Sequence, residues 1–275
     1  MANTLIMRTK DGKILHLECH ESISSTHELA RSYARAGYND GYVIFSEYQT
    51  KYGSLGQALE PGTREHGVYL SCILRPSIFA SQVGFLGAMS AVAFITALEM
   101  QTDKRLGIGW ISDIFCEGER IGTTSTEGKV DNNNTAANNG NGNNNAAYEY
   151  IIVSFAVKLT DEYFPQRLSD MIKRVFESEN TSVPMIMAKN ILSNFFALYP
   201  KNIRAPEKFM ETYKKKFILS GVNARFIENG KRRRCKILGI EAYDGRLIIE
   251  DRHGDIKHIS ANRNIILPNK IKLKR

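Results

Sequence analysis

The chain contains 275 residues, of which 43% are hydrophobic and 24% are charged; this composition favours a globular protein over a disordered one, with room for one sizeable core and a small second domain. The formal net charge of +8 and the isoelectric point near 9.2 favour an anionic partner such as nucleic acid, a phosphate-bearing ligand or an acidic protein, although ordinary soluble proteins also carry such an excess. The four cysteines are far apart and form no CxxC pair, which argues against a zinc knuckle or a disulfide framework and favours a reducing compartment.

Residues 1–15 lack a charged segment followed by a long apolar core, so they do not resemble a secretory signal, and we expect a cytoplasmic protein. The next segment, residues 14–20, alternates apolar and polar side chains with the period of a half-buried strand. Its polar face carries His16, Glu18 and His20. These side chains could bind a metal, but a zinc site usually needs three or four converging ligands, so we favour solvated strand-face residues and no metal site.

A short helix is predicted to begin next. Ser25 and Glu28 have the spacing of a capping box, and Leu29 and Tyr33 follow at helical spacing. Residues 41–49 and 67–76 are rich in β-branched and aromatic side chains, which predicts two strands joined by the loop 50–66. Residues 83–98 form the longest apolar stretch, which is shorter than the roughly 20 residues of a membrane span. We therefore expect a buried helix there and no membrane association.

A hairpin and an insertion are predicted in the middle of the chain. The segment 106–128 has a turn signal at Glu117-Gly118. The Asn-rich run at residues 131–147 has almost nothing to bury and is expected to be a disordered insertion at a hairpin tip. A strand then resumes at residues 148–159, and the pattern predicts amphipathic helices around residues 166–177, 184–198 and 206–216.

From Gly221 the pattern changes to short strands. They are separated by the turn pairs Asn229-Gly230, Asp244-Gly245 and His253-Gly254, a spacing typical of a small antiparallel barrel. This change predicts two domains, at residues 1–220 and 221–275. A barrel of roughly fifty residues is close to the size at which a lone core is marginal, so we expect it to pack against the first domain.

The order of these elements and several short motifs resemble the biotin-protein ligase family over about residues 24–267. Ser25-Thr26-His27 is similar to the family's Ser-Thr-Asn, and Gln49 is similar to its Gln before a glycine-arginine loop. Tyr69-Leu70-Ser71 is similar to the family's Tyr-Leu-Ser strand, and residues 109–113 are similar to its Lys-Trp-Pro-Asn-Asp strand end. The resemblance implies an α+β fold with a layer of helices on a class II synthetase-like mixed sheet of the biotin/lipoate ligase type. It also implies an SH3-like β-barrel at the C-terminus.

Members of this family join biotin to AMP, using ATP and magnesium, and pass the biotinyl group to a lysine of a carrier domain. Adenylation brings a carboxylate up to a triphosphate, so cations and backbone N–H groups must offset several negative oxygens at once. The family supplies a Gly-Arg-Gly-Arg loop, a lysine before the tryptophan and a second lysine ahead of a Gly-Ile-Leu turn. The resemblance therefore implies biotin, ATP and Mg²⁺ as cofactors if the activity is retained.

Most of the charged positions of the family differ in this chain. The arginine loop corresponds to Tyr52-Gly53-Ser54-Leu55, the first lysine to Gly109, Pro-Asn to Ile111-Ser112, and the Gly-Ile-Gly-x-Asn strand to residues 154–158, which begin with Ser154. The second lysine is similar to Arg120, and Trp110 and Asp113 are retained. A charge-assisted hydrogen bond contributes about 1.5–3 kcal/mol, so losing three removes roughly 5–9 kcal/mol, or about four to six powers of ten in rate.

The candidate site residues follow from this correspondence. Ser25, Thr26 and Gln49 are candidates for binding a small polar ring, with a capping box and a strand-end polar residue as the equal alternative. Trp110 is a candidate adenine platform, although a buried core residue is favoured, and Asp113 is a further ligand-binding candidate. Arg120 is the one candidate catalytic residue.

Three functions remain open from the sequence. The leading one is a non-catalytic or severely weakened relative that binds a protein, such as a biotin carrier domain, or a biotin-like ligand. The second is an active divergent ligase that uses Arg120, Arg64 and Lys158 as substitute cations. The third is binding to nucleic acid or ribosomal RNA, although a solvated strand face is the favoured reading of its candidates, Lys231, Arg232, Arg233, Arg234 and Lys236. The family also suggests a homodimer through an exposed sheet edge.

Overall fold

The structure is a computed structural model. It describes residues 3–9, 11–54, 56–76, 80–131, 148–160, 164, 182–199, 205–241, 245–259, 265–266 and 271, without the side chains of residues 80–84. Residues 132–147 of the Asn-rich run, the helix predicted at 166–177 and Leu55 lie outside this part of the chain.

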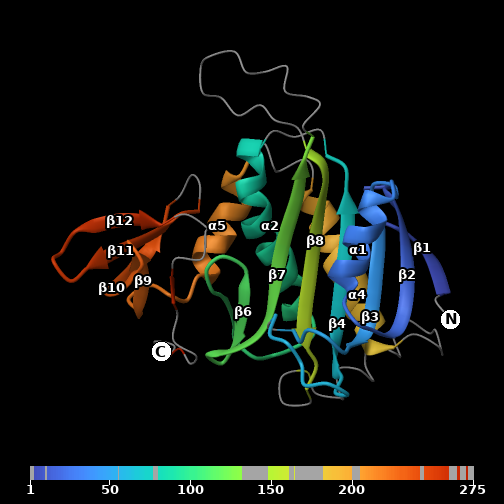
Figure 1. Ribbon diagram of the computed structural model, residues 1–275, viewed down its shortest axis with the longest axis horizontal. Coiled ribbons are helices and arrows are strands. Elements are labelled where there is room, and N and C mark those ends of the chain that lie inside the picture. Colours follow the sequence, from blue (N-terminus) through green and yellow to red (C-terminus); the bar gives the residue numbers. More distant parts are fainter. Residues whose placement is uncertain are drawn as a thin grey trace, which may run out of the picture.

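An eight-stranded mixed sheet forms the larger part of the molecule (Figure 1), with the strand order β1-β2-β3-β4-β8-β7-β6-β5. Only β2 and β3 run parallel among these neighbours. The bounds are β1 Asn3–Arg8, β2 Ile14–Ile23, β3 Tyr42–Gln49, β4 Glu65–Leu74, β5 Leu106–Ile108, β6 Asp113–Cys116, β7 Glu119–Val130 and β8 Tyr148–Lys158. The strands predicted from residue 14 through residue 159 are thus confirmed, as is the turn at Glu117-Gly118, where both residues have positive φ.

Helices lie on both faces of this sheet. Helices α2 (Ala80–Glu99) and α4 (Val183–Leu198) cover one face, and α5 (Glu207–Lys216) packs beside α2. Helix α1 (Thr26–Arg35) crosses the other face over β3, β4 and β8, as Figure 1 shows. A single layer of helices on the sheet was therefore an incomplete expectation, because Ala30 and Ala34 of α1 bury Ile44, Ile73 and Ile152 in a second, smaller core.

The apolar stretch of the sequence is a buried helix, as predicted. The described side chains of α2 from Leu86 to Leu98 are nearly all buried in the main core, where Phe94 meets Phe155 of β8 edge to face. In the part of the chain that the structure describes, no helix is long and apolar enough to cross a membrane.

Glu18 is a correction to the sequence analysis. It was expected on a solvated strand face, but only 9% of the residue is exposed, because α1 and β3 cover it. Its carboxylate accepts hydrogen bonds from Tyr42 Oη at 2.6 Å and Tyr33 Oη at 3.2 Å, and His20 Nε2 lies 2.8 Å away. Burial opposes ionisation, but these hydrogen bonds prevail and lower the pKa of Glu18.

A second, antiparallel sheet of five strands follows, in the order β12-β11-β10-β9-β13. Its strands are β9 Asn223–Glu228, β10 Lys231–Ile240, β11 Leu247–Asp251, β12 Ile256–Ile259 and β13 Ile265–Ile266. The Asn229-Gly230 turn has φ of 50° and 72°, as a two-residue hairpin requires. No pairing joins β12 to β13 among these described strands, so closure into an SH3-like barrel stays a prediction, as does the boundary at residue 220.

The smaller sheet packs against the larger part of the molecule. Phe226, Ile237 and Leu247 are buried in the same continuous core cluster as the residues under α2 and α4. The indole Nε1 of Trp110 donates a hydrogen bond of 3.0 Å to the carbonyl of Gly245, across the two sheets. Strand β1 is an edge strand in which Leu5 is 41% and Ile6 73% exposed, so a sheet edge is available for the predicted homodimer. The homodimer itself stays a prediction.

Candidate ligand pocket

A pocket of about 410 Å³ opens where the N-terminus of α1 meets β4, β7, β8 and the loop after β3. Ser25, Thr26 and Gln49, three of the predicted ligand-binding residues, line it together. The described residues of its wall are Ser25, Thr26, His27, Glu28, Arg31, Gln49, Tyr52, Gly53, Gly56, Tyr69, Thr123, Ser125, Ser154, Phe155 and Ala156. A volume of this order suits a small organic molecule.

The start of α1 is set by two polar side chains. Ser25 is the N-cap, and its hydroxyl accepts a hydrogen bond of 3.3 Å from the backbone N–H of Glu28. Gln49 Oε1 accepts from the backbone N–H of Thr26 at 2.8 Å, and Gln49 Nε2 donates to the carbonyl of Tyr52 at 2.7 Å. The structure therefore shows the capping role of Ser25 and Gln49, and both residues also line the pocket.

A chain of hydroxyl groups continues from Thr26 across the sheet. Ser71 Oγ donates to Thr26 Oγ1 at 3.0 Å and lies 2.8 Å from Ser154 Oγ. Ser154 Oγ is in turn 2.7 Å from His27 Nδ1. The alternation of β4 and β8 produces this alignment, because Ser71 and Ser154 are direct partners in the antiparallel register and point to the same face.

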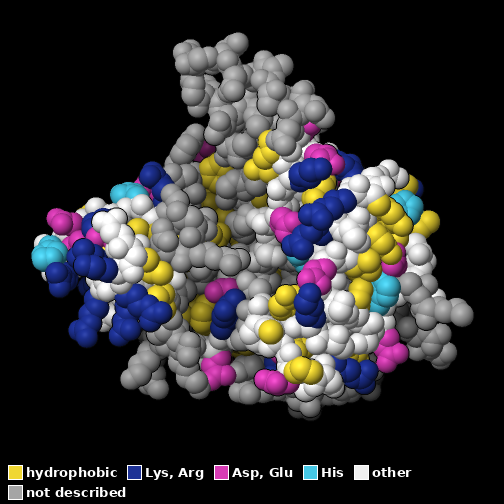
Figure 2. Space-filling view, in the orientation of Figure 1, with side chains coloured by type: hydrophobic (Ala, Val, Ile, Leu, Met, Phe, Trp, Pro, Cys, Tyr) yellow, Lys and Arg dark blue, Asp and Glu magenta, His cyan; other side chains and the backbone are white. Residues whose placement is uncertain are grey.

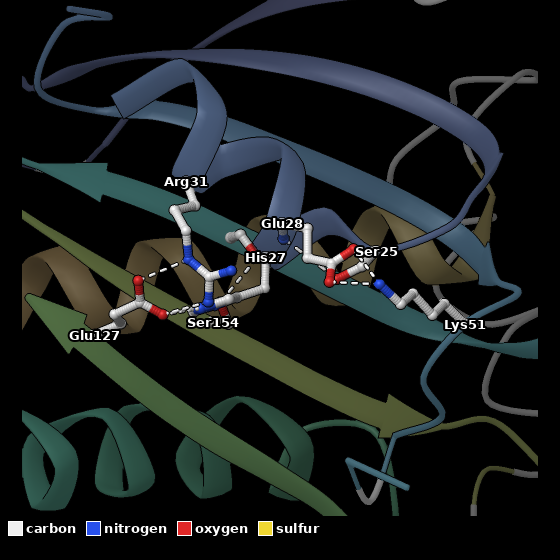
Figure 3. A network of polar contacts seen from close by, with 8 residues as sticks. Ser25, His27, Glu28, Arg31, Lys51, Glu127 and Ser154 are labelled. Atoms are coloured by element: carbon white, nitrogen blue, oxygen red, sulfur yellow. Dashed lines mark hydrogen bonds and ion pairs between the residues drawn. The ribbon is translucent and has the colours of Figure 1, made fainter. Parts of the chain in front are cut away.

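An ion-paired cluster closes the chain on the β7 side (Figure 3). His27 Nε2 lies 2.8 Å from Glu127 Oε2, and Arg31 binds the same carboxylate through Nε at 2.7 Å and Nη2 at 2.5 Å. The bidentate hydrogen bonds from Arg31, followed by the contact with His27, lower the pKa of Glu127 to about 2, although burial opposes the shift. Glu127 thus stays ionised and balances the charge of Arg31 at neutral pH.

The loop that was predicted to correspond to the family's arginine loop is organised around an acid. Glu65 Oε1 accepts hydrogen bonds from the backbone N–H of Ser54 at 2.5 Å and from Tyr69 Oη at 2.7 Å. A Cβ added to Gly53 would lie 2.9 Å from Gln57 Nε2 and 3.1 Å from Glu65 Oε1, so the loop is tightly packed. A backbone N–H that would be available to an anion therefore already binds a carboxylate.

The predicted nucleotide-end residues lie outside this wall. Trp110 is 6% exposed, and its one N–H donates to Gly245, which is the behaviour of a core residue. Asp113 Oδ1 lies 2.8 Å from Arg120 Nη2 and accepts from Thr123 Oγ1 at 2.9 Å. Burial raises the pKa of Asp113, opposed by Arg120. Through Thr123 this ion pair stands directly behind the pocket wall.

The other substitute cations are also engaged or distant. The guanidinium of Arg64 lies 4.2 Å from the centre of the Tyr48 ring, and its Nη1 is 3.8 Å from Glu21 Oε1. Lys158 is at the end of β8, opposite Gly67, and does not line the pocket. The basic residues between Lys231 and Lys236 belong to β10 in the other sheet.

Sequence reasoning missed Arg31 and Glu127 as members of the site. A signal existed for Arg31, because it follows His27 by four residues and so lies on the same face of the helix. No local pattern marks Glu127, which joins the cluster only through the pairing of β7 with β8.

Comparison with known proteins agrees with this architecture. No family model matches the chain. The bifunctional ligase/repressor BirA of Bacillus subtilis (strain 168) is 28% identical over 112 residues, 41% of this chain and 34% of that protein. The match to a second BirA, from Bacillus spizizenii, covers 48% of its length, so the chain matches less than half of each curated relative.

Two solved structures extend the likeness to nearly the whole chain. The biotin protein ligase of Aquifex aeolicus has a TM-score of 0.61 at 16% identity, covering 92% of this chain and 97% of that one. A biotin protein ligase-like protein of unknown function from Silicibacter sp. TM1040 has a TM-score of 0.63 at 12% identity, covering 93% and 97%. At these identities the structures show the fold, and the BirA match adds the relationship in sequence. The chain is therefore related to the biotin-protein ligases in both sequence and fold.

Proposed function

We propose that this chain is a biotin-protein ligase-like binding protein in which adenylation is lost or severely weakened. It holds a small ligand with an uncharged polar ring, of the biotin type, in the pocket at α1, and a biotin carrier domain is the protein partner that its relatives suggest. The observation that carries the proposal is the charge of the pocket wall. Among its described residues Arg31 is the one permanent cation, and Glu127 binds its guanidinium at two positions.

The residues present do not fit a magnesium–triphosphate group. A triphosphate needs several cations or backbone N–H groups that are available at the same time. Here Glu65 accepts from the N–H of Ser54, and Arg120 lies against Asp113. A bound triphosphate would compete with these carboxylates, and it would compete with Glu28 for the ammonium group of Lys51, which lies 2.7 Å from Glu28 Oε1. Each contact makes nucleotide binding less favourable.

A neutral polar ring fits the same wall better. The bond from Gln49 Nε2 to Tyr52 uses one of the two amide hydrogens of Gln49, and the hydroxyl groups of Ser25 and Ser125 belong to the same wall. Donors and acceptors arranged around a mostly pre-formed cavity are typical of sites for small molecules. The likeness of Ser25, Thr26 and Gln49 to the family's biotin-head residues gives the ligand its proposed chemistry.

Calorimetric titration of the protein with biotin and with ATP–magnesium, in separate experiments, tests this proposal. We expect heat of binding from biotin alone. The substitution Thr26→Val should weaken biotin binding by removing a hydroxyl from the wall, whereas Thr63→Val in the exposed loop should not. Absence of biotin binding would contradict the ligand assignment.

A biotinylation assay tests the loss of adenylation directly. Protein incubated with biotin, ATP, magnesium and a biotin carrier domain should label the carrier no faster than background. Robust transfer would contradict the proposal. If that transfer then disappeared in Arg120→Ala or Arg64→Ala, the result would identify an active divergent ligase that uses those residues as substitute cations.

A further inference from the structure

The outward side of the smaller sheet carries an unusual set of cations. Its strands alternate buried and exposed residues, so that Phe226, Cys235 and Ile237 enter the core while the intervening side chains face solvent. Four of the side chains on this outward side are basic, and together they form what we call the basic face: Arg225 of β9 and Arg232, Arg234 and Lys236 of β10. Figure 2 shows Lys and Arg side chains gathered at this end of the molecule.

Like charges are placed directly opposite each other on the basic face. Arg225 pairs with Arg234 across the two strands, an arrangement that destabilises a sheet unless an anion lies nearby. In the part of the chain that the structure describes, neither arginine has an acidic partner within ion-pair distance. The sheet does form ion pairs elsewhere, because Glu228 binds both Arg233 and Lys257.

The structure thus separates the basic residues that the sequence grouped together. Arg233 is half-buried and lies 2.9 Å from Glu228, on the opposite side of β10 from its neighbours. Lys231 is exposed at the hairpin turn, where it pairs in register with Glu228. The remaining three residues of β10 share one side with Arg225, which the sequence analysis did not include.

A groove of about 740 Å³ runs beside the basic face. Arg225, Arg234, Lys236 and Arg252 line it, together with the acids Glu250 and Asp251. Asp251 is already engaged, since it accepts from the backbone N–H of His253 at 2.8 Å and lies 3.2 Å from Lys257 Nζ. Glu250 is the register partner of Lys236. Four cations against these two acids leave the groove with an excess of positive charge.

We propose that the basic face binds the phosphodiester backbone of a nucleic acid without reading its sequence. A polymer with a phosphate at every nucleotide supplies anions close enough together to satisfy the opposed Arg225 and Arg234 at once. Arginine, which provides three of the four cations, matches phosphate with two parallel hydrogen bonds. An acidic protein presents carboxylates at irregular intervals along its chain, whereas the phosphates of a nucleic acid repeat at every nucleotide.

The remaining outward side chains exclude base stacking as the main contact. The described residues on the same side of β9, β10 and β11 include Ile227, Leu238 and Ile248, and none of them is aromatic. Recognition of single-stranded bases commonly requires aromatic platforms. The contact is therefore electrostatic and directed to the backbone. It is also separate from the ligand pocket, because the smaller sheet and α1 lie at opposite ends of the molecule in Figure 1.

Fluorescence anisotropy with a labelled 20-nucleotide poly-uridylate strand and a labelled 20-base-pair DNA duplex, at several salt concentrations, tests the proposal. Four phosphate contacts predict a slope of log affinity against log salt of about −3 for the single strand. The triple substitution Arg225→Gln, Arg234→Gln and Lys236→Gln should reduce the magnitude of that slope to about 1 and weaken binding at low salt at least tenfold. Arg234→Lys keeps the charge and should retain the slope.

The matched control removes three exposed cations from the rest of the molecule, by Arg35→Gln, Lys129→Gln and Lys215→Gln, for the same change in net charge. Its salt slope should remain near that of the unchanged protein. Equal losses in the two triple variants, or no binding of either nucleic acid at low salt, would overturn the proposal. Poly-glutamate that binds as tightly as poly-uridylate would overturn the assignment to nucleic acid. Biotin titration of the basic-face variant should be unchanged, which keeps this test independent of the ligand pocket.

Discussion

His27 lies between two polar side chains: its Nδ1 is 2.7 Å from Ser154 Oγ, and its Nε2 is 2.8 Å from Glu127 Oε2. His27 belongs to α1 and Ser154 to β8, so their contact joins the helix to the sheet beneath it. Glu127 of β7 extends the same polar network to the next strand.

A double-mutant cycle measures whether these two residues act together. We expect His27→Ala and Ser154→Ala each to lower the free energy of unfolding, and the two effects to differ from additivity by about 0.5–3 kcal/mol, as residues in one hydrogen-bond network do. Urea unfolding of the single and double variants gives the coupling. The pair His27→Ala and Thr63→Ala, which share no contact, should be additive. Additivity in the first pair would show that the His27–Ser154 contact contributes nothing.

The ion pair between Arg31 and Glu127 should make the free energy of unfolding depend on pH in the acid range. The pKa of Glu127 is lowered from 4.5 to about 2 in the folded chain, first by the hydrogen bonds from Arg31. A depressed carboxyl pKa contributes stability that is complete above the unfolded value and is lost as the pH falls toward the folded value. The difference in unfolding free energy between the unchanged protein and Arg31→Gln should therefore be largest above about pH 5 and shrink between pH 4.5 and pH 2.

Urea unfolding at pH 7 and at pH 3 provides the measurement. Because Glu127 is more than one-third exposed, solvent screens the pair and the effect will be modest. Arg35→Gln, which removes an exposed arginine from the same helix, is the control and should show no such change with pH. A difference that grows toward low pH would contradict the role of Arg31.

Secondary-structure elements were the most predictable level of this protein. The alternation in β2 and β10, the cap at Ser25 and the turn residues each depend on neighbours within a few positions, and local patterns record them. The burial of Glu18 was not predictable in this way, because α1 and Tyr42 reach it through the tertiary fold. The same holds for the residues of the site. Ser25, Thr26 and Gln49 were predicted from the resemblance to family motifs, whereas Glu127 was not predicted, because only the pairing of β7 with β8 brings it to the site.

The opposed arginines of β9 and β10 should lower the free energy of unfolding. Arg225 and Arg234 face each other across the strands, and like charges in this position are unfavourable by about 0.2–1 kcal/mol. Arg234→Gln should therefore raise the free energy of unfolding by about that amount, and the gain should decrease as salt screens the repulsion. Chemical unfolding at low and high salt measures it. Arg233→Gln breaks the ion pair with Glu228 and should give no gain. A destabilised Arg234→Gln would mean that the arginine has a favourable local role.

The two sheets share one core. Phe226, Ile237 and Leu247 of the smaller sheet belong to the same cluster of buried residues as Phe94 and Phe155 of the larger part. A sheet of this size buries little surface by itself, so the contact supplies much of its stability. The sequence predicted this packing from length alone, but not its polar contact, because the partner of Trp110 is 135 positions away at the Gly245 turn.

We expect the whole chain to unfold in a single cooperative transition as a result. Trp110 is the one tryptophan of the sequence and lies at the contact between the sheets, so its fluorescence reports that contact, while circular dichroism reports the entire fold. The two signals should give the same midpoint in urea. Trp110→Phe removes the indole N–H from the Gly245 carbonyl and should lower the free energy of unfolding by at least about 0.5–1.5 kcal/mol. Ile256→Ala, on an exposed position of β12, is the control and should change it little. Separate midpoints would show that the smaller sheet unfolds independently, because two sheets that share one core should unfold together.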